Sequence, residues 1–453
     1  MDDIKEKNME KVAPKITFRM KPADEMILGA YVEPLMYSSY RQWGADVTFD
    51  EAILDIKHSG MNTLFQANSR LNETDERWLD QHGYTMELLD ATSRHRLNLL
   101  FKDAKVMAHG NILKLHSKEE AYKYFKDTYG PFWERYDSFA GLHFVDEPGY
   151  KDWKNYAPIE EAFNEAFPDK LFFLNLLQTY APHWAFPNGP FHTPDAEGWL
   201  PPDGDVNKYY QSYIDTMKPT LFAYDHYPIR ESFPAVEPDY FYQLHLSKEY
   251  AKKCNAPILA FIQVGAWGDR TRVPTDAELR WQVNCAIAYN TKHLGYYTYW
   301  MTGVYPHHRC MMVDEHGNKT KQWFRIKQIN KELLFQDEYF LNAAFNGYIQ
   351  VGKMPSSEKP VESDRLKSFG NYKDVSGGNL FIGCFDYVKE DKRYNMYYVV
   401  NNDLVNEVHE TFNFKKGMTY TFIHRDSKVV QKSDKVQLSL TPGDACIIIE
   451  GLK

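Results

Sequence analysis

Short apolar runs recur along the chain up to about residue 300. Each run is rich in leucine, β-branched and aromatic residues, and almost every position in it is apolar. Runs of this length and texture predict strands that are buried on both faces, as in a parallel sheet. The predicted strands are MILGAYV from Met26, MNTLFQA from Met61, LNLLFK from Leu97, GLHFVDE from Gly141, LFFLNLL from Leu171, TLFAYDHY from Thr220, PILAFIQV from Pro257 and LGYYTYW from Leu294.

Segments with a helical spacing of apolar residues separate these runs. In FDEAILDIKHSG, Ile53 and Ile56 fall on one helix face, and Gly60 follows as a typical residue after a helix end. Thr275-Asp-Ala-Glu278 has the pattern of a capping box at the start of a later helix. Strands and helices therefore alternate along this part of the chain.

Eight such alternations predict a (β/α)8 TIM barrel over residues 26–345, after an N-terminal extension of residues 1–25. An open, doubly wound sheet is the structural alternative, and the lack of a glycine-rich phosphate loop after the first strand disfavours it. Beyond the barrel, residues 346–453 form short strands broken by Gly, Asn, Asp and Lys. This pattern predicts a small antiparallel β-sandwich domain.

Composition excludes several classes of protein. Hydrophobic residues make up 43% and charged residues 25%, which is typical of a globular chain. The net charge of −9 argues against nucleic acid as the main partner. No apolar run reaches the roughly 18 residues of a membrane span, so no membrane partner is expected. The sequence does not predict an oligomeric state.

The five cysteines contain no CxxC pair, which indicates reduced thiols rather than a disulfide framework or a zinc ribbon. His307, His308 and Cys310 lack a second group of ligands at a metal-binding spacing, so neither a metal nor another cofactor is predicted. The first residues are charged and lack an apolar signal core. This favours a cytoplasmic location, or a secreted or periplasmic one if a leader was removed.

Aromatic residues reach 15%, which indicates a large aromatic core, a cleft whose rings stack on sugars, or both. Barrel enzymes build their sites at the C-terminal ends of the strands. Polar and aromatic residues at those ends suit a neutral, polyhydroxylated substrate. The candidates for substrate binding are Glu33, Asn68, Lys102, Asp103, Asn175, Tyr227, Gln263, Trp267 and Trp300.

The strongest local signal is FVDEPG, residues 144–149. Glycoside cleavage needs a carboxylic acid that protonates the leaving oxygen, and a second group that stabilises the oxocarbenium-like transition state. Asp146 next to Glu147 would raise the pKa of the glutamic acid, as an acid catalyst requires. The structural alternative is that Asp146 caps a helix and Glu147 pairs with a surface lysine.

A second signal is YDHYP, residues 224–228, which would place Asp225 at the barrel mouth next to Tyr224 and Tyr227. An Asx turn before Pro228 is an equally good interpretation of this segment. Lys102 could bind substrate hydroxyls with Asp103, or form a Schiff base as in an aldolase, although a solvated lysine is the commoner case.

The barrel and its β-rich tail resemble the retaining glycoside hydrolases of the large (β/α)8 clan, especially β-galactosidase-like barrels. FVDEP, AYDHYP, AELRWQVNCAIAYNTKHLGYYTYW and YYVVNND…LTPGDACIII carry the resemblance. It implies that Glu147, at the end of the fourth strand, is the acid/base. The family nucleophile is a glutamate at the end of the seventh strand, where this chain has Gln263.

Three arrangements accommodate this difference. In the first, Asp225 or Glu33 supplies the second carboxylate. In the second, Asp146-Glu147 resembles the Asp-Glu pair of hexosaminidase-type barrels, in which the substrate's acetamido group attacks. In the third, the barrel binds sugars without cleaving them. Gln263 is expected to point into the cleft and bind substrate. The predicted function is therefore a glycosidase with Glu147, Asp146 and Asp225 as catalytic residues. The alternative is a catalytically silent carbohydrate-binding barrel.

Overall fold

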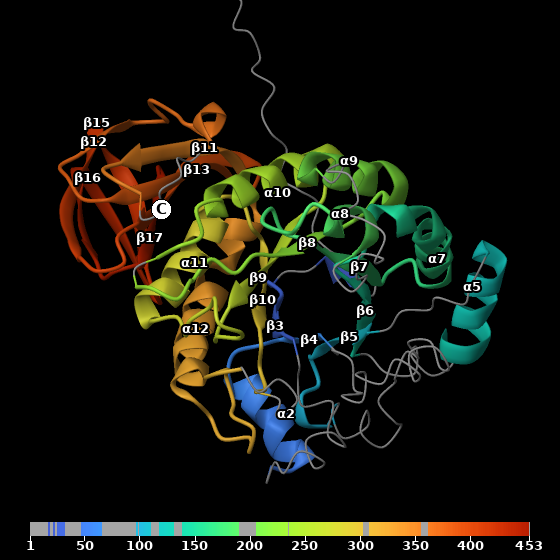
Figure 1. The fold of residues 1–453 in the computed structure, drawn as a ribbon. Helices are drawn as coiled ribbons and strands as arrows, with labels where there is room; N and C mark the ends of the chain where they lie inside the picture. Colours follow the sequence, from blue (N-terminus) through green and yellow to red (C-terminus); the bar gives the residue numbers. More distant parts are fainter. Residues whose placement is uncertain are drawn as a thin grey trace, which may run out of the picture.

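The structure is a computed structural model that describes residues 17–18, 21–22, 25–31, 47–65, 97, 99–109, 117–130, 138–189, 205–233, 235–301, 308–354 and 361–452. Eight parallel strands form a barrel with helices outside it, as Figure 1 shows. These strands are β3 (Leu28–Ala30), β4 (Thr63–Phe65), β5 (Lys105–His109), β6 (Phe139–Asp146), β7 (Leu171–Leu176), β8 (Phe222–Asp225), β9 (Ile258–Gln263) and β10 (His293–Tyr297). Their spatial order is β3-β10-β9-β8-β7-β6-β5-β4.

The helices lie between the strands in sequence and outside them in space. They are α2 (Phe49–His58), α5 (Lys118–Tyr124), α7 (Trp153–Ala166), α8 (Ala185–Asn188), α9 (Val206–Met217), α10 (Tyr240–Cys254), α11 (Asp276–Ala288) and α12 (Lys321–Leu341). Shorter elements are the β1 (Thr17–Phe18) and β2 (Lys21–Pro22) pair and the turns η2 (Phe125–Tyr129), η3 (Tyr150–Asp152) and η4 (Glu362–Asp364). The predicted capping box is confirmed at the start of α11, where the Thr275 side chain accepts from the Glu278 amide at 3.2 Å.

A side chain helps to close the ring between β3 and β4. The backbone amide of Asn62 donates to the Leu28 carbonyl at 3.0 Å. The Asn62 side chain accepts from the Leu28 amide at 3.0 Å and donates to the Met26 carbonyl at 2.8 Å. The predicted (β/α)8 barrel is thus confirmed.

Seven of the eight predicted strands are confirmed, and the third is wrong. Within 97–102, the described residues Leu97, Leu99 and Leu100 are helical, and the Phe101 amide donates to the Leu97 carbonyl at 2.7 Å. Leu97 and Phe101 are buried whereas Leu99 is 64% exposed, which is a helical pattern. The strand is the next segment, β5.

This correction moves two predicted substrate-binding residues. Lys102 and Asp103 lie in the exposed turn that precedes β5. They are therefore at the N-terminal end of a barrel strand, and the candidate site lies at the opposite end. The prediction that they bind substrate at the mouth is wrong.

Aromatic rings fill much of the barrel interior. Tyr31 stacks on Phe261 at a centroid distance of 4.3 Å, and Phe65 meets Phe261 edge-on at 5.5 Å. Gly295 on β10 leaves room for these rings, because a Cβ there would lie 2.2 Å from the Phe261 ring. Part of the high aromatic content is therefore explained by core packing.

The tail is a seven-stranded antiparallel sheet. Its strands are β11 (Ala343–Val351), β12 (Tyr372–Val375), β13 (Leu380–Lys389), β14 (Lys392–Asn401), β15 (Val408–His424), β16 (Ser427–Leu440) and β17 (Ala445–Glu450). β11 begins a few residues before position 346, where the sequence places the start of the tail. A shift of register in β15, between Asn413 and Met418, lets this long strand pair with β12 near one end and β17 near the other.

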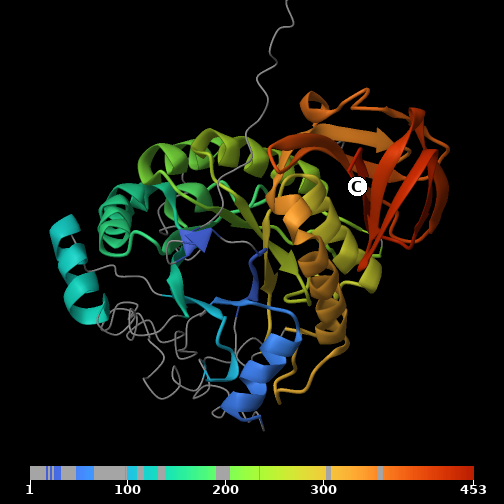
Figure 2. The same cartoon turned by 180° about the vertical axis from the view of Figure 1, so that it is seen from behind.

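Alternate residues of the tail strands face two cores. Tyr397 and Val399 of β14 belong to the core that the sheet encloses, whereas Tyr398 and Val400 belong to the core shared with the barrel. The Tyr398 hydroxyl donates to Asn284 on α11 at 2.7 Å. Figure 2 shows the tail beside the barrel helices.

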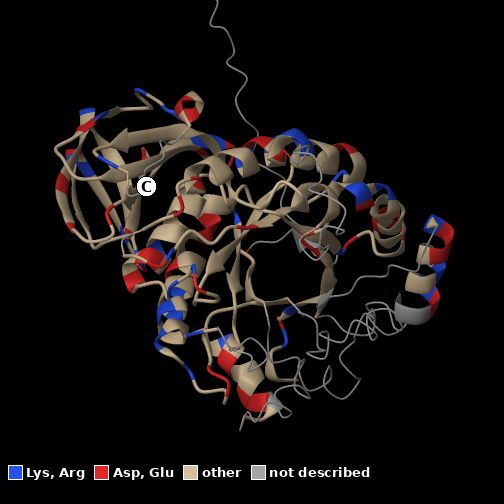
Figure 3. Ribbon diagram, in the orientation of Figure 1, with Lys and Arg blue, Asp and Glu red and all other residues tan. Residues whose placement is uncertain are grey.

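Charged residues lie mainly on the outer helices and the tail, while the barrel strands are almost free of them (Figure 3). Among the residues that the structure describes, no helix has the length and apolarity needed to cross a membrane.

Candidate active site

Two acidic residues end strand β6 at the mouth of the barrel. Between His143 and Asp146, β6 has one more residue than the facing stretch of β7, from Phe173 to Asn175. Such a bulge bends a strand and changes where its last side chains point. Glu147 follows with φ 46°, in the left-handed region, and its amide donates to the Asn175 carbonyl at 2.8 Å.

The side chain of Asn175 connects two of the predicted catalytic acids. Its amide nitrogen donates to Asp146 Oδ1 at 2.9 Å and to Asp225 Oδ1 at 3.3 Å. The three residues come from β6, β7 and β8, which are neighbours in the barrel, so their side chains converge. Asn175 Oδ1 is buried and has no hydrogen-bond partner among the described residues. It is a buried acceptor that an internal water molecule can satisfy.

Asp225, Glu147 and Asp146 differ in exposure: the first is buried, the second half-buried and the third exposed. Burial, followed by the charge of Asp146, raises the pKa of Asp225 to about 8. Burial and then the charges of Asp225 and Asp146 raise the pKa of Glu147 well above its usual range. These effects favour the protonated forms of both Glu147 and Asp225.

The pKa of Asp146 is also raised, because protein atoms surround its carboxyl group although the residue as a whole is exposed. Hydrogen bonds from Asn175 and Tyr31 act in the opposite direction. These hydrogen bonds favour the ionised form of Asp146, whereas burial and neighbouring charge favour the protonated forms of Glu147 and Asp225.

Tyr31 and His143 extend this acid cluster, and the sequence analysis missed both. Tyr31 Oη makes a long hydrogen bond of 3.5 Å to Asp146 and lies 3.2 Å from His143 Nε2. The His143 ring is buried and stacks on Phe173 at 4.8 Å. Both residues lie in or next to apolar strands, where a polar ring gives no separate signal.

An aromatic group stands beside the acids. Tyr227 hydrogen-bonds the Asp225 carboxyl group. Its ring meets Trp267 edge-on at 4.7 Å and Tyr297 at 5.3 Å. Trp267 is partly exposed. The structure therefore brings the predicted residues Tyr227 and Trp267 together near Asp225, with Tyr297 as a member that the sequence analysis missed.

Gln263 does not have the predicted orientation. Its side chain is fully buried and bonded to backbone groups on every side. Oε1 accepts from the Ile229 amide at 2.9 Å, and Nε2 donates to the carbonyls of Ile229, Gly265 and Arg272 at 3.1–3.2 Å. Gln263 therefore holds the loops after β8 and β9 together, and the prediction that it points into the cleft is wrong.

Trp300 is also unsuited to substrate binding. Its ring is completely buried in the core shared with the tail, and its backbone pairs with Val313. Glu33, Asn68 and His307 lie outside the described residues.

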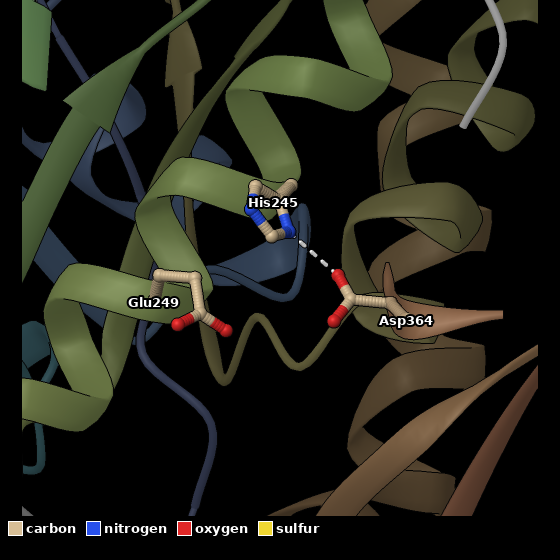
Figure 4. A group of neighbouring side chains, drawn as sticks. All are labelled: His245, Glu249 and Asp364. Carbon is tan, nitrogen blue, oxygen red and sulfur yellow. Dashed lines mark hydrogen bonds and ion pairs between the residues drawn. The ribbon is translucent and has the colours of Figure 1, made fainter. Parts of the chain in front are cut away.

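One cluster has the composition of a metal site. His245 and Glu249 of α10 and Asp364 of η4 place potential ligand atoms within 4.8 Å of one another (Figure 4). The ammonium group of Lys248, however, lies 2.6 Å from Asp364 and also contacts Glu249. His245 and Tyr289 bond the other Asp364 oxygen, each at 2.6 Å. The lysine ammonium group occupies the position that a metal ion would take. The cluster therefore links α10 of the barrel to η4 of the tail through ion pairs and hydrogen bonds.

The sequence matches no model of a protein family, and no curated protein matches it significantly. Solved structures match its fold. A glycoside hydrolase has a TM-score of 0.52 at 9% identity, over 98% of this chain and 96% of that one. The arabinose complex of α-L-arabinofuranosidase from Thermotoga maritima (TM-score 0.46, 9% identity) covers 97% and 98% of the two chains. α-Galactosidase I from Mortierella vinacea (0.47, 9%) covers 95% and 97%. These similarities concern the fold: a parallel barrel followed by an antiparallel sheet.

Proposed function

We propose that this protein is a glycoside hydrolase in which Glu147 is the general acid and Asp146 the ionised carboxylate. The observation that carries the proposal is the cluster at the barrel mouth, where Asn175 bonds both Asp146 and Asp225 beside Glu147. Acid and base roles follow from environments that separate the pKa values of neighbouring carboxyl groups. The fold that this chain shares with a glycoside hydrolase supports the same reaction class.

The division of roles follows from exposure and charge. Glu147 is half-buried and protonated, so it can reach a glycosidic oxygen and give up its proton as the bond to the anomeric carbon breaks. Asp146 is accessible and ionises first, so it stabilises the positive charge that develops on the sugar ring. Water then attacks the anomeric carbon and returns a proton to Glu147. Asp225 is buried, and negative charge on it adds to the effect of burial in raising the pKa of Glu147.

Variants test these roles on 4-nitrophenyl glycosides of a panel of sugars. Glu147→Gln is expected to lower kcat about 10²–10⁴-fold. It should also remove the alkaline limb of the pH profile, where the wild type loses activity as Glu147 deprotonates. A 2,4-dinitrophenyl leaving group needs no protonation, so it should largely rescue Glu147→Gln. It should not rescue Asp146→Asn.

The exposed Asp269, in the loop after β9, gives a matched control, and Asp269→Asn should keep wild-type activity. A fluoro-sugar that traps covalent intermediates should form no adduct on residues 257–269, because Gln263 is buried and bonded. Sugar binding without turnover on any glycoside would contradict the proposal and favour the silent carbohydrate-binding barrel. Full activity in Glu147→Gln would refute the assignment of the acid.

A further inference from the structure

A cavity of about 410 Å³ opens beside the acid cluster. This volume lies within the range of pockets that bind small ligands. Its walls come from the loops that follow β7, β8 and β9, so it lies on the catalytic face of the barrel. The residues that line it are Tyr180, Arg230, Glu231, Ser232, Glu237 and Arg270. We call this cavity the outer pocket.

Tyr180 is the wall between the outer pocket and the acids. Its hydroxyl accepts a hydrogen bond from the Tyr227 amide at 3.2 Å, and Tyr227 in turn bonds Asp225. Burial raises the pKa of Tyr180, and negative charge on Asp225 and Glu147 adds to this effect. A ligand in the outer pocket is therefore one side chain away from the proposed catalytic groups.

The charges that line the outer pocket balance. Arg230 is ion-paired with Glu237 and lies over the Tyr180 ring at 4.8 Å. Arg270 and Glu231 are exposed, and neither has an ion-pair partner among the described residues. The lining thus includes an exposed donor group, on Arg270, and an exposed acceptor group, on Glu231. A sugar hydroxyl both donates and accepts, so a neutral sugar fits this lining better than an anion or a cation.

An exposed aromatic side chain lies one residue beyond the lining of the outer pocket. Phe233 follows Ser232 in the chain and is 51% exposed. One of its faces is covered by Arg272, whose guanidinium lies 5.2 Å from the ring centre and is anchored by the buried Glu278. A fixed aromatic ring with solvent-accessible surface beside a polar pocket is suited to the apolar face of a sugar.

The loops that carry these side chains are held in place. Arg230 pairs by a backbone bridge with Thr271, so the loops after β8 and β9 run side by side. The buried amide of Gln263 bonds the backbone of Ile229 on one loop and Arg272 on the other. The pocket therefore exists before a ligand arrives, which lowers the entropic cost of binding.

From these observations we infer that the outer pocket binds a second, neutral sugar unit of the substrate, so the natural substrate is an oligosaccharide or a glycan chain. This inference rests on the proposed glycosidase function. It predicts that the enzyme prefers a chain of sugars to a single sugar joined to an aryl group. A hydrogen bond between the second sugar unit and a charged side chain of the pocket corresponds to an increase of about tenfold or more in the affinity for the substrate.

The test compares kcat/KM for the 4-nitrophenyl monoglycoside that the enzyme cleaves with kcat/KM for oligosaccharides of two to five units of that sugar. The wild type is expected to gain about tenfold or more from the second unit. Arg270→Ala and Phe233→Ala should each lose most of this gain and keep activity on the aryl glycoside. Arg365→Ala in the tail and Phe324→Ala on α12 replace exposed side chains of the same types and should behave as wild type.

Each outcome decides one of the two proposals. Cleavage of the aryl glycoside without any gain from chain length refutes the sugar subsite and leaves the glycosidase intact. A gain confined to sugars that carry a carboxylate or sulfate also refutes it, because the lining would then recognise charge. If no glycoside is cleaved, the glycosidase proposal fails, and a glycan array decides the subsite. Binding of the wild type to oligosaccharides on the array that is lost in Arg270→Ala and Phe233→Ala then supports the sugar subsite. No binding by the wild type, or unchanged binding by the two variants, refutes it.

Discussion

Replacing Asp225 with asparagine is expected to stabilise the protein at alkaline pH and to shift the pH dependence of its activity. The pKa of the buried Asp225 carboxyl is about 8 in the folded protein, against about 3.9 in an unfolded chain. Between these values the unfolded state binds fewer protons than the folded state, so stability falls as pH rises from about 4 to about 8. A shift of about four units corresponds to roughly 5 kcal/mol. Asparagine keeps the shape and can accept from Asn175, but it does not ionise.

The assay is the midpoint of thermal unfolding (Tm) at several pH values. At pH 8 the Tm of Asp225→Asn should exceed that of the wild type by at least about 4 °C, and the difference should shrink toward zero near pH 4.5. The same variant should move the alkaline limb of the pH–rate profile to lower pH, because it removes a charge that raises the pKa of Glu147. Asp269→Asn, an exposed control, should give no difference in Tm that depends on pH. A Tm difference for Asp225→Asn that stays constant from pH 4.5 to pH 8 would refute this account.

Three further changes probe the framework of the site. Gln263→Leu leaves buried backbone groups unpaired at about 1–3 kcal/mol each, so its Tm should fall by several degrees, and an unchanged Tm would contradict the role of Gln263 between the loops. Asp364→Asn should lower the Tm at neutral pH, because it weakens the ion pair with Lys248. EDTA or Zn²⁺ should leave the wild-type Tm unchanged, since the lysine ammonium group fills the position that a metal ion would take. A rise in Tm with Zn²⁺ would indicate a metal site. Gly141→Ala should abolish soluble expression, because its Cβ would lie 2.0 Å from the Leu171 carbonyl, whereas Gly417→Ala, with nothing closer than 3.9 Å, should express normally.

The barrel could be predicted because strands buried on both faces are continuous apolar runs, which residues 171–176 and 258–263 illustrate. The same rule failed at Leu97–Lys102. Six residues with apolar positions three and four apart fit a helix end as well as a strand, and the structure distinguishes them by the hydrogen bond from the Phe101 amide to the Leu97 carbonyl and by the exposure of Leu99. The error in one strand then placed Lys102 at the wrong end of the barrel.

The acid cluster could be predicted in part because parallel strands end on one face, which brings Asp146, Asn175 and Asp225 together. The orientation of a side chain at a strand end depends on what the adjoining loops need. The Gln263 side chain hydrogen-bonds the backbone of two loops, and the sequences of these loops contain no pattern that indicates such a requirement. Tyr31 reaches the site across 115 positions of sequence, a relation that no local pattern contains.

At position 147 the residue that is best for stability differs from the residue that the proposed reaction requires, because the backbone of Glu147 is left-handed. A residue other than glycine pays roughly 1–2 kcal/mol for such a conformation, and the Glu147 carboxyl group is also crowded by two other acids. Glycine would relieve both penalties. A library randomised at position 147 and sorted for soluble yield alone should therefore become enriched in glycine and asparagine. The same library sorted for sugar release should retain glutamate. Without selection for turnover, neutral drift would thus replace Glu147 early, and the replacement would increase the stability of the folded protein.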